Sequence, residues 1–198
     1  MNKNLNNCFC FNNANDNFIK WIIELLGPVI LSAKPAEIVS FPNKEKLSMS
    51  KINQVKHIIS KTNKILFREF SYCNKCTKMF FYNPILLDNT LNEHRNLKFL
   101  KSIGYPNEYS LNKYLDYIID KMKSGNIPDE IGVFLGYPLK DVIGFIGHPS
   151  LKLTKINGWR VYGDSRLSDK RYMEFLNARK QMKKLLEIGN PENILLLA

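Results

Sequence analysis

The sequence has few of the residues that build disulfide frameworks and metal centres. Its 198 residues include only four cysteines and three histidines. The histidines do not recur at the H-x-x-x-H or H-E-x-x-H spacing of helical zinc sites. Four cysteines in a chain of this length do not make the dense disulfide framework of a small secreted domain, and we expect a protein of the reducing cytoplasm.

The sequence also lacks an uninterrupted apolar run of membrane-spanning length. Its most apolar stretch, residues 18–33, contains Lys20 and Glu24 and is interrupted by Gly27 and Pro28. A bilayer-spanning helix needs about 20 mostly apolar residues, and a secretory segment does not normally contain a glutamate. We therefore expect neither a membrane span nor a signal peptide in this stretch, and no membrane partner.

Motifs for nucleotide binding and serine hydrolysis are absent. Neither the G-x-x-x-x-G-K-[ST] and G-x-G-x-x-G phosphate loops nor the G-x-S-x-G nucleophile elbow occurs. Acidic residues are scarce as well, because 18 Asp and Glu face 29 Lys and Arg, for a net charge of +11. This balance favours nucleic acid, anionic lipid or an acidic protein as partner, although lysines spread along the chain are more typical of a solvated surface.

The pattern that is present predicts an α+β fold, a mostly helical single domain with a small antiparallel sheet. Periodic apolar residues and capping signals predict helices over residues 16–26, 50–62, 84–103, 110–124 and 168–188, with short helices after Pro128 and Pro138. Asn83 and Ser110 are the expected N-caps of the helices that follow them. Aromatic-rich runs over 64–72 and 77–82 predict a β-hairpin within the sheet, near 64–82, and Trp159–Tyr162 predicts a further strand.

Two details of this prediction can be tested directly. Gly27 and Pro28 should end the first helix, because glycine at a C′ position is commonly followed by a residue that cannot continue a helix. The last helix should bury Phe175, Ala178, Met182 and Leu185. We expect the domain to span 16–198, preceded by a disordered asparagine-rich tail over 1–15.

Cysteines flank the predicted hairpin turn in the order Cys73-Asn74-Lys75-Cys76. A C-x-x-C at a hairpin tip can direct two thiolates at one metal ion, as in a zinc knuckle. A structural zinc site needs four ligands, and the other two thiols, Cys8 and Cys10, lie in the tail. The pair is therefore either half of a weakly supported metal site or two thiols without metal, and we assign no metal ligand.

Special residues are densest between Pro128 and Gly147. Gly132, Gly136, Gly144 and Gly147 lie among large apolar side chains, with a few polar exceptions. Glycine inside a helix costs about 1 kcal/mol against alanine, so it usually serves close packing or ligand approach. Both interpretations stay open: tight helix packing, or a pocket in which Glu130 or Asp141 orients a ligand.

This stretch resembles a known family. The run from Pro128 to Pro138, followed by Asp141-Val142 and Gly144-Phe145-Ile146, is similar to the signature of a bacterial family of unknown function, domain of unknown function 3793. Further agreement comes from short motifs in the same order along the chain, namely Lys34-Pro35-Ala36, Gly104-Tyr105-Pro106 and the run from Gly158 to Gly163.

The resemblance implies no assigned reaction. Relatives often have a cysteine shortly before the Lys-Pro-Ala motif and a histidine just before Glu-Ile-Gly, which together could supply a thiol nucleophile and its base. Here Leu26 and Asp129 stand at those positions, so this chain lacks both groups. The resemblance also implies a setting near flavodoxin-like electron carriers, which suggests redox or iron physiology and an acidic partner protein.

Three functions remain in view. The first is a non-catalytic binding or accessory protein, with no catalytic residue, an unidentified cofactor, and a surface built around Lys34, Glu130, Tyr137, Asp141, Trp159 and Tyr162. The second is an enzyme in which Glu130 or Asp141, enclosed by Phe134, Tyr137 and Phe145, has a raised pKa and acts as acid or base. The third is nucleic-acid binding through the Lys and Arg residues of the 44–68 segment and of the final helix (Arg179, Lys180, Lys183, Lys184), with Phe80 and Tyr82 stacking on bases.

Overall fold

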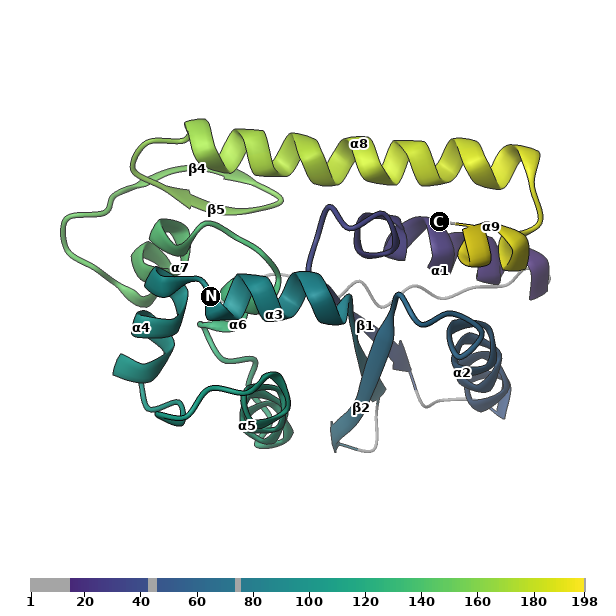
Figure 1. The fold of residues 1–198 in the computed structure, drawn as a ribbon, viewed down its shortest axis with the longest axis horizontal. Coiled ribbons are helices and arrows are strands. Elements are labelled where there is room, and N and C mark those ends of the chain that lie inside the picture. The colour runs from purple at the N-terminus through teal and green to yellow at the C-terminus, as the bar shows by residue number, and fades with distance from the viewer. Residues whose placement is uncertain (1–14, 43–45, 74–75, 198) are drawn as a thin grey trace.

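A computed structural model describes residues 15–42, 46–73 and 76–197 (Figure 1). The helices of these ranges are α1 (Asn15–Ile30), α2 (Lys46–Ile59), α3 (Pro84–Asn92), α4 (His94–Ser102), α5 (Leu111–Lys123), α6 (Ile131–Phe134), α7 (Leu139–Ile146), α8 (Arg166–Ile188) and α9 (Pro191–Leu197). The strands are β1 (Ala36–Pro42), β2 (Leu66–Cys73), β3 (Cys76–Tyr82), β4 (Leu153–Asn157) and β5 (Trp159–Tyr162). The predicted α+β class, mostly helical with a small antiparallel sheet, is confirmed.

The main sheet is antiparallel with strand order β1-β3-β2. The hairpin predicted near 64–82 is present as β2 and β3, and β1 adds to the free side of β3, so that Ala36 pairs with Tyr82. Successive side chains of a strand point to opposite faces, and on β3 Met79 and Phe81 face one core while Phe80 and Tyr82 face another. β3 is therefore apolar on both faces.

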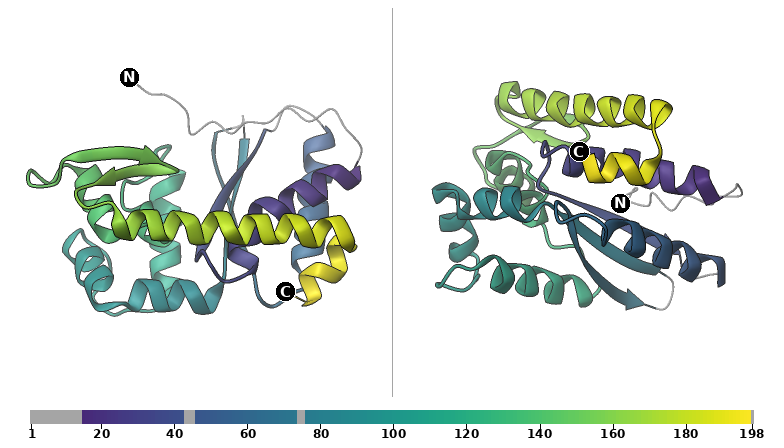
Figure 2. Two further views of the ribbon diagram at one scale, coloured as in Figure 1. Left: turned by 90° about the horizontal axis from the view of Figure 1, so that it is seen from above. Right: turned by 45° about the vertical axis from the view of Figure 1, so that its right-hand side comes forward.

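Helices cover the two faces of this sheet in separate groups. The core on the Met79 face is filled from α1, α2, α8 and α9, and the core on the Phe80 face from α3, α4, α5, α6 and α7. Figures 1 and 2 show α8 lying alongside α1 and extending beyond it over β4 and β5. This extension brings α8 next to the second group of helices, where the candidate site lies.

The first helix continues past the residues that were expected to end it. Gly27 and Pro28 lie inside α1, and the amide of Leu31 still donates to the Gly27 carbonyl at 2.9 Å. The glycine serves packing, because a Cβ at position 27 would lie 2.6 Å from Cβ of Met182 on α8. The prediction of a helix end at Gly27 was therefore wrong, since a tertiary contact requires this residue to be small.

Other local predictions are confirmed. The side chain of Asn83 accepts from the amide of Leu86 at the start of α3, and Ser110 accepts from the amide of Lys113 at the start of α5. The helical stretch predicted over 84–103 is divided between α3 and α4 at Glu93, whose side chain caps α4. These caps are local hydrogen bonds, so the sequence alone can specify them.

Two elements near the C-terminal half were not predicted. β4 pairs antiparallel with β5 to form a second, two-stranded sheet, and α9 follows α8. Along α8 the buried residue is Leu186 rather than the predicted Leu185, which is exposed. The asparagine-rich tail lies outside the described residues apart from Asn15, which begins α1. Within the described part of the chain, no helix is long and apolar enough to cross a membrane.

Candidate functional site

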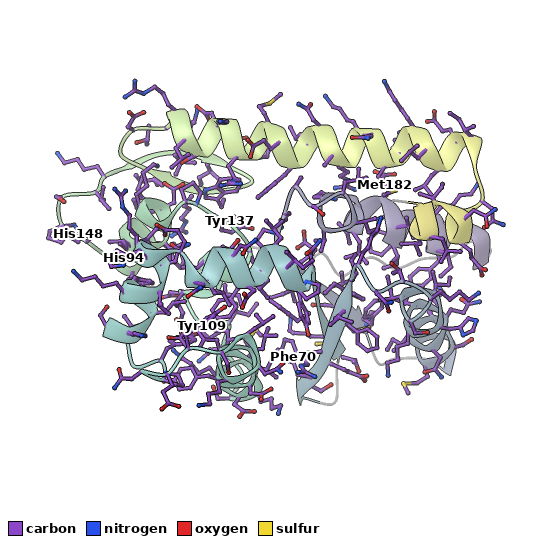
Figure 3. The ribbon with its side chains drawn as sticks, viewed as in Figure 1. Phe70, His94, Tyr109, Tyr137, His148 and Met182 are labelled. Carbon is purple, nitrogen blue, oxygen red and sulfur yellow. The ribbon has the colours of Figure 1, made fainter. Side chains whose placement is uncertain are left out.

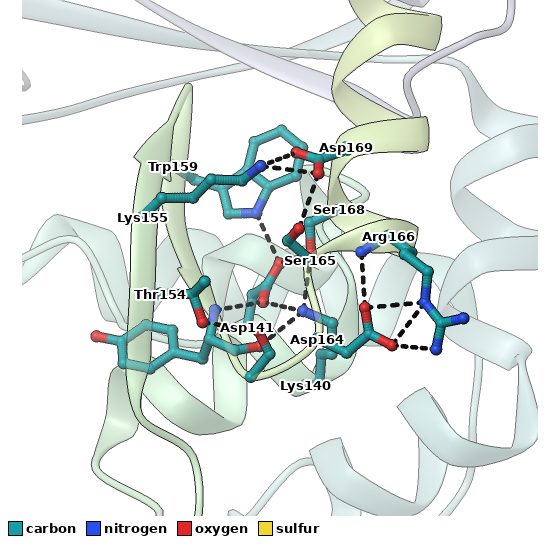
Figure 4. A network of polar contacts seen from close by, with 12 residues as sticks. Lys140, Asp141, Thr154, Lys155, Trp159, Asp164, Ser165, Arg166, Ser168 and Asp169 are labelled. Carbon is teal, nitrogen blue, oxygen red and sulfur yellow. Dashed lines mark hydrogen bonds and ion pairs between the residues drawn. The ribbon is translucent and has the colours of Figure 1, made fainter.

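Asp141 lies in the first turn of α7 and is enclosed by three elements. Its Oδ1 accepts from Nζ of Lys140 at 2.6 Å and from the backbone amide of Tyr162 at 2.9 Å. Its Oδ2 accepts from Nε1 of Trp159 at 2.8 Å and from Oγ of Ser168 at 2.6 Å (Figure 4). We call these five residues the Asp141 network. It joins α7, β5 and the first turn of α8.

The two charged groups of the network, the Asp141 carboxylate and the Lys140 ammonium, find all their hydrogen-bond partners within it. The Asp141 side chain is 1% exposed, and its two oxygens receive four donors, which is about the full accepting capacity of a carboxylate. Nζ of Lys140 donates to Asp141, to the Tyr162 carbonyl at 2.8 Å and to Oγ of Ser168 at 2.8 Å. An ammonium has three N–H donors, so Lys140 is saturated as well.

Tyr162 itself is held against α7 by a close backbone approach. A Cβ at Gly144 would lie 2.4 Å from Cγ of Tyr162, so only glycine fits at this point of α7. For Gly144, the close-packing interpretation of the glycine-rich stretch is therefore sufficient. Gly136 has a positive φ of 78° and faces the Pro35 ring, which places the 136–137 turn against the segment leading into β1.

Lys34 lies beside the Asp141 network, in the connection between α1 and β1. Its ammonium binds Oε2 of Glu37 at 2.7 Å and lies over the rings of Tyr137 and Phe175, 5.6 and 5.5 Å from their centroids. The side chain is only 7% exposed. Burial opposes the charge, but Glu37 and Tyr137 outweigh it, and the pKa of Lys34 is raised. Lys34 is thus a protonated ammonium at neutral pH.

Tyr137 and Trp159 connect Lys34 to the Asp141 network. Their rings stack at 4.4 Å between centroids with an interplanar angle of 14°, and Trp159 also contacts Tyr172 and Phe175 of α8. Burial raises the pKa of the Tyr137 phenol. Tyr137 is half-buried and lies below α8 in the view of Figure 3. Five of the six residues named from the sequence, Lys34, Tyr137, Asp141, Trp159 and Tyr162, therefore form one connected set.

Glu130, the sixth residue, has other partners. Its Oε1 accepts from the Tyr105 hydroxyl at 3.2 Å and from the ammonium of Lys121 on α5. Burial and the Glu130 carboxylate raise the pKa of Tyr105. Of the three rings expected to enclose the carboxylate, Phe145 is exposed and lies under Arg160.

The comparison with protein families identifies the chain. A family model described as "Protein of unknown function (DUF3793)" matches residues 22–195, which include every residue of the Asp141 network and Lys34. The chain belongs to this family. The resemblance inferred from the sequence is therefore confirmed. No curated protein and no solved structure matches the chain.

The DUF3793 chain offers little to a metal ion in its described part. Among residues 15–42, 46–73 and 76–197, no group of three His, Cys, Asp or Glu side chains is arranged to hold one. His57, His94 and His148 are all exposed, and Figure 3 shows His148 at the left-hand edge of the molecule. Cys73 pairs in register with Cys76 across the β2–β3 hairpin, whereas Cys8, Cys10 and the turn residues 74 and 75 lie outside the described residues.

Sequence reasoning missed several residues of the candidate site. Lys140, Ser168, Phe175 as an aromatic partner of Lys34, and Glu37 are all required to complete the contacts described above. Glu37 could have been predicted as the ion-pair partner of Lys34, because it follows Lys34 by only three residues. Ser168 was interpreted only as the start of the last helix, so its role as a buried hydroxyl donor was missed.

Proposed function

We propose that this DUF3793 protein is a binding or accessory protein that catalyses no reaction of its own. The observation that carries the proposal is the saturation of Asp141, whose two oxygens each accept from two donors while the side chain is buried. A general acid or base must exchange a proton with a substrate at hydrogen-bonding distance. Asp141 has neither a vacant lone pair nor access to a substrate.

The other two charged candidates support the same conclusion. Glu130 is buried and held by Lys121 and Tyr105, so its carboxylate neutralises a neighbouring ammonium. Lys34 has a raised pKa and is paired with Glu37, whereas a nucleophilic lysine must lose its proton. These charges are better suited to fixing the fold around a binding surface than to chemistry.

The proposal also includes a cytoplasmic location and a link to redox or iron physiology. The low cysteine count motivates the first, and the setting near flavodoxin-like electron carriers that the resemblance implies motivates the second. Native mass spectrometry with an absorption spectrum, on protein purified without oxygen, checks the second. A co-purified flavin, haem or iron would support a carrier or accessory role in that physiology, whereas a clean apo mass would favour a role through a protein partner or nucleic acid.

A metabolite-depletion assay tests the absence of catalysis. The purified protein is incubated with a small-molecule extract of the cells that encode it, and mass spectrometry follows the extract over time. We expect no time-dependent change beyond that seen with heat-inactivated protein. A substrate consumed by the wild type, but not by Glu130→Gln or by a folded Asp141→Asn variant, would overturn the proposal in favour of an acid–base enzyme.

A further inference from the structure

Exposed apolar side chains lie on the β4–β5 hairpin and at the end of α7. Phe145 at the end of α7 is 44% exposed, and Ile156 of β4 is 72% exposed. Ile146 and Leu153 are exposed too, and so are all the remaining residues of 145–150 and 152–156. Figures 1 and 2 place this hairpin at one end of the molecule, on the left. We call Phe145, Ile146, Leu153, Ile156 and Arg160 the hairpin face.

Strand register places these side chains together. Ile156 is the direct partner of Arg160, and Leu153 is the partner of Tyr162, so all four lie on one face of the hairpin. Only its Tyr162 end is covered, by Gly144 of α7, whereas Leu153, Ile156 and Arg160 are exposed. The guanidinium of Arg160 lies 5.4 Å from the centroid of the Phe145 ring. Ile156 and Leu153 therefore share a face of the hairpin with an exposed cation–π pair.

The Asp141 network makes this surface rigid. Asp141 binds the Trp159 side chain and the Tyr162 amide, which lie on either side of Arg160 along β5. Lys140 binds the Tyr162 carbonyl, so both backbone polar groups of that residue are held by α7. A surface that is already ordered loses less conformational entropy on binding, and its affinity for a partner is correspondingly higher.

The charge of the hairpin face has one sign. Residues 142–163 contain no Asp or Glu, and they include Lys152, Lys155 and Arg160. Lys155 is paired with Asp169 of α8 on the other face, whereas Lys152 and Arg160 are exposed. An exposed apolar patch with a charged rim is typical of a protein–protein interface. Here the rim is positive.

We propose that the hairpin face binds an acidic partner protein, through a segment that combines large apolar side chains with Asp or Glu. The proposal rests on the proposed binding function and names the class of partner. Aliphatic side chains do not stack on bases as aromatic rings do, so Ile146, Leu153 and Ile156 favour protein over nucleic acid. A second copy carries the same net charge of +11 and the same positive rim, which disfavours self-association.

Peptide display tests this proposal although the partner itself is unidentified. The probe is a random library of peptides of about 12 residues, which span about 40 Å when extended. The library is selected against the full chain. We expect the enriched peptides to combine at least two large apolar residues with Asp or Glu. In fluorescence polarisation, Ile156→Ser and Arg160→Glu should each weaken their binding about tenfold or more.

Controls separate the hairpin face from general stickiness and from unfolding. Ile85 of α3 is 74% exposed, so Ile85→Ser removes an equally exposed apolar side chain elsewhere and should leave peptide binding unchanged. All three substitutions are at exposed positions and should leave the unfolding midpoint unchanged. Peptides without acidic residues, or peptides whose binding ignores Ile156→Ser and Arg160→Glu, would overturn the proposal.

Two other occupants would give distinct results and would also overturn it. Sedimentation of the chain with vesicles rich in phosphatidylserine, lost in Ile156→Ser, would assign the face to a membrane surface. Concentration-dependent dimerisation lost in the same variant would assign it to a second copy. If the hairpin face does not bind acidic peptides, the metabolite-depletion result is unaffected. The absence of catalysis and the identity of the partner are therefore judged separately.

Discussion

At the scale of single residues, Asp141 combines complete burial with complete hydrogen bonding. Removing its charge leaves the Lys140 ammonium without its counterion while both side chains stay in place, and an amide at this position would direct N–H donors at existing donors. Breaking a buried ion pair by changing one partner costs about 3–5 kcal/mol. We expect Asp141→Asn to lower the free energy of unfolding by about that amount in urea titration.

The matched control for this prediction is Asp164, which lies two residues after Tyr162 and pairs with Arg166 at the surface. Exposed ion pairs contribute little to stability because water and salt screen them. Asp164→Asn should leave the urea midpoint close to that of the wild type. Equal effects of the two substitutions would show that Asp141 does not act as a structural anchor.

The Asp164 carboxylate itself provides a pH prediction. Hydrogen bonds from the Arg166 side chain and backbone amide lower its pKa to about 2. Because this value lies below the unfolded value of about 3.9, the ionised carboxylate favours the folded chain at higher pH, and this contribution is lost as pH falls from about 4 towards 2. The contribution is small because water screens the exposed pair, in keeping with the tolerance expected for Asp164→Asn. NMR titration of the carboxyl group should show the low value, and Arg166→Gln should raise it. An unchanged pKa in that variant would refute the role of Arg166.

At the scale of elements, the contact between α7 and β5 depends on Gly144. A methyl group there would lie within 2.8 Å of three atoms of the Tyr162 side chain, and the Asp141 network holds the Tyr162 backbone in place. Overpacking of this kind typically costs about 1–3 kcal/mol. We expect Gly144→Ala to destabilise the chain by about that amount and to loosen β5, seen as faster hydrogen exchange of the Tyr162 amide.

Gly189 is the control for Gly144. It follows α8 with φ −126°, and a Cβ there would have its nearest neighbour at 3.4 Å, in the flexible side chain of Ile194. Gly189→Ala should therefore be tolerated. If Gly144→Ala is tolerated equally well, the α7–β5 contact is not as tight as the geometry indicates.

At the scale of the whole molecule, the net charge of +11 predicts weak binding to any polyanion. Lys180, Lys183 and Lys184 are exposed on α8 and would contribute to it. Binding to a mixed oligonucleotide pool should weaken about tenfold or more between about 50 and 200 mM salt, because it depends on the release of counterions. A filter-binding titration measures this, and salt-independent binding would instead indicate a dedicated nucleic-acid site.

Much of the local structure was predictable from particular residues. Asn83 and Ser110 cap their helices as expected, and the aromatic runs around Cys73 and Cys76 form the expected hairpin. The prediction failed where a local signal competed with a distant contact. Gly27 resembles a helix end, but its absent side chain makes room for Met182, which lies far away in the sequence. β4 was missed because its residues are exposed and show no clear alternation of apolar and polar side chains.

The candidate site was predictable only in part, for the same reason. The glycine-rich stretch and the neighbouring motifs indicated Lys34, Tyr137, Asp141, Trp159 and Tyr162, and these residues are connected in space. Glu130 belongs to a different set of contacts, with Tyr105 and Lys121. The extent of the single domain, 16–198, stays a prediction.

The sequence by itself determined the fold class, the helix caps, the β2–β3 hairpin and the family, because these depend on local hydrogen bonds, periodicity and motif order. Only the tertiary structure decided what the charged residues do. Whether Asp141 is a proton carrier or an anchor depends on donors from Trp159, Tyr162 and Ser168, and these reach it only when β5 and α8 pack against α7. The exposure of the hairpin face was likewise decided by packing, since Ile156 and a core isoleucine have the same side chain and differ only in what covers them.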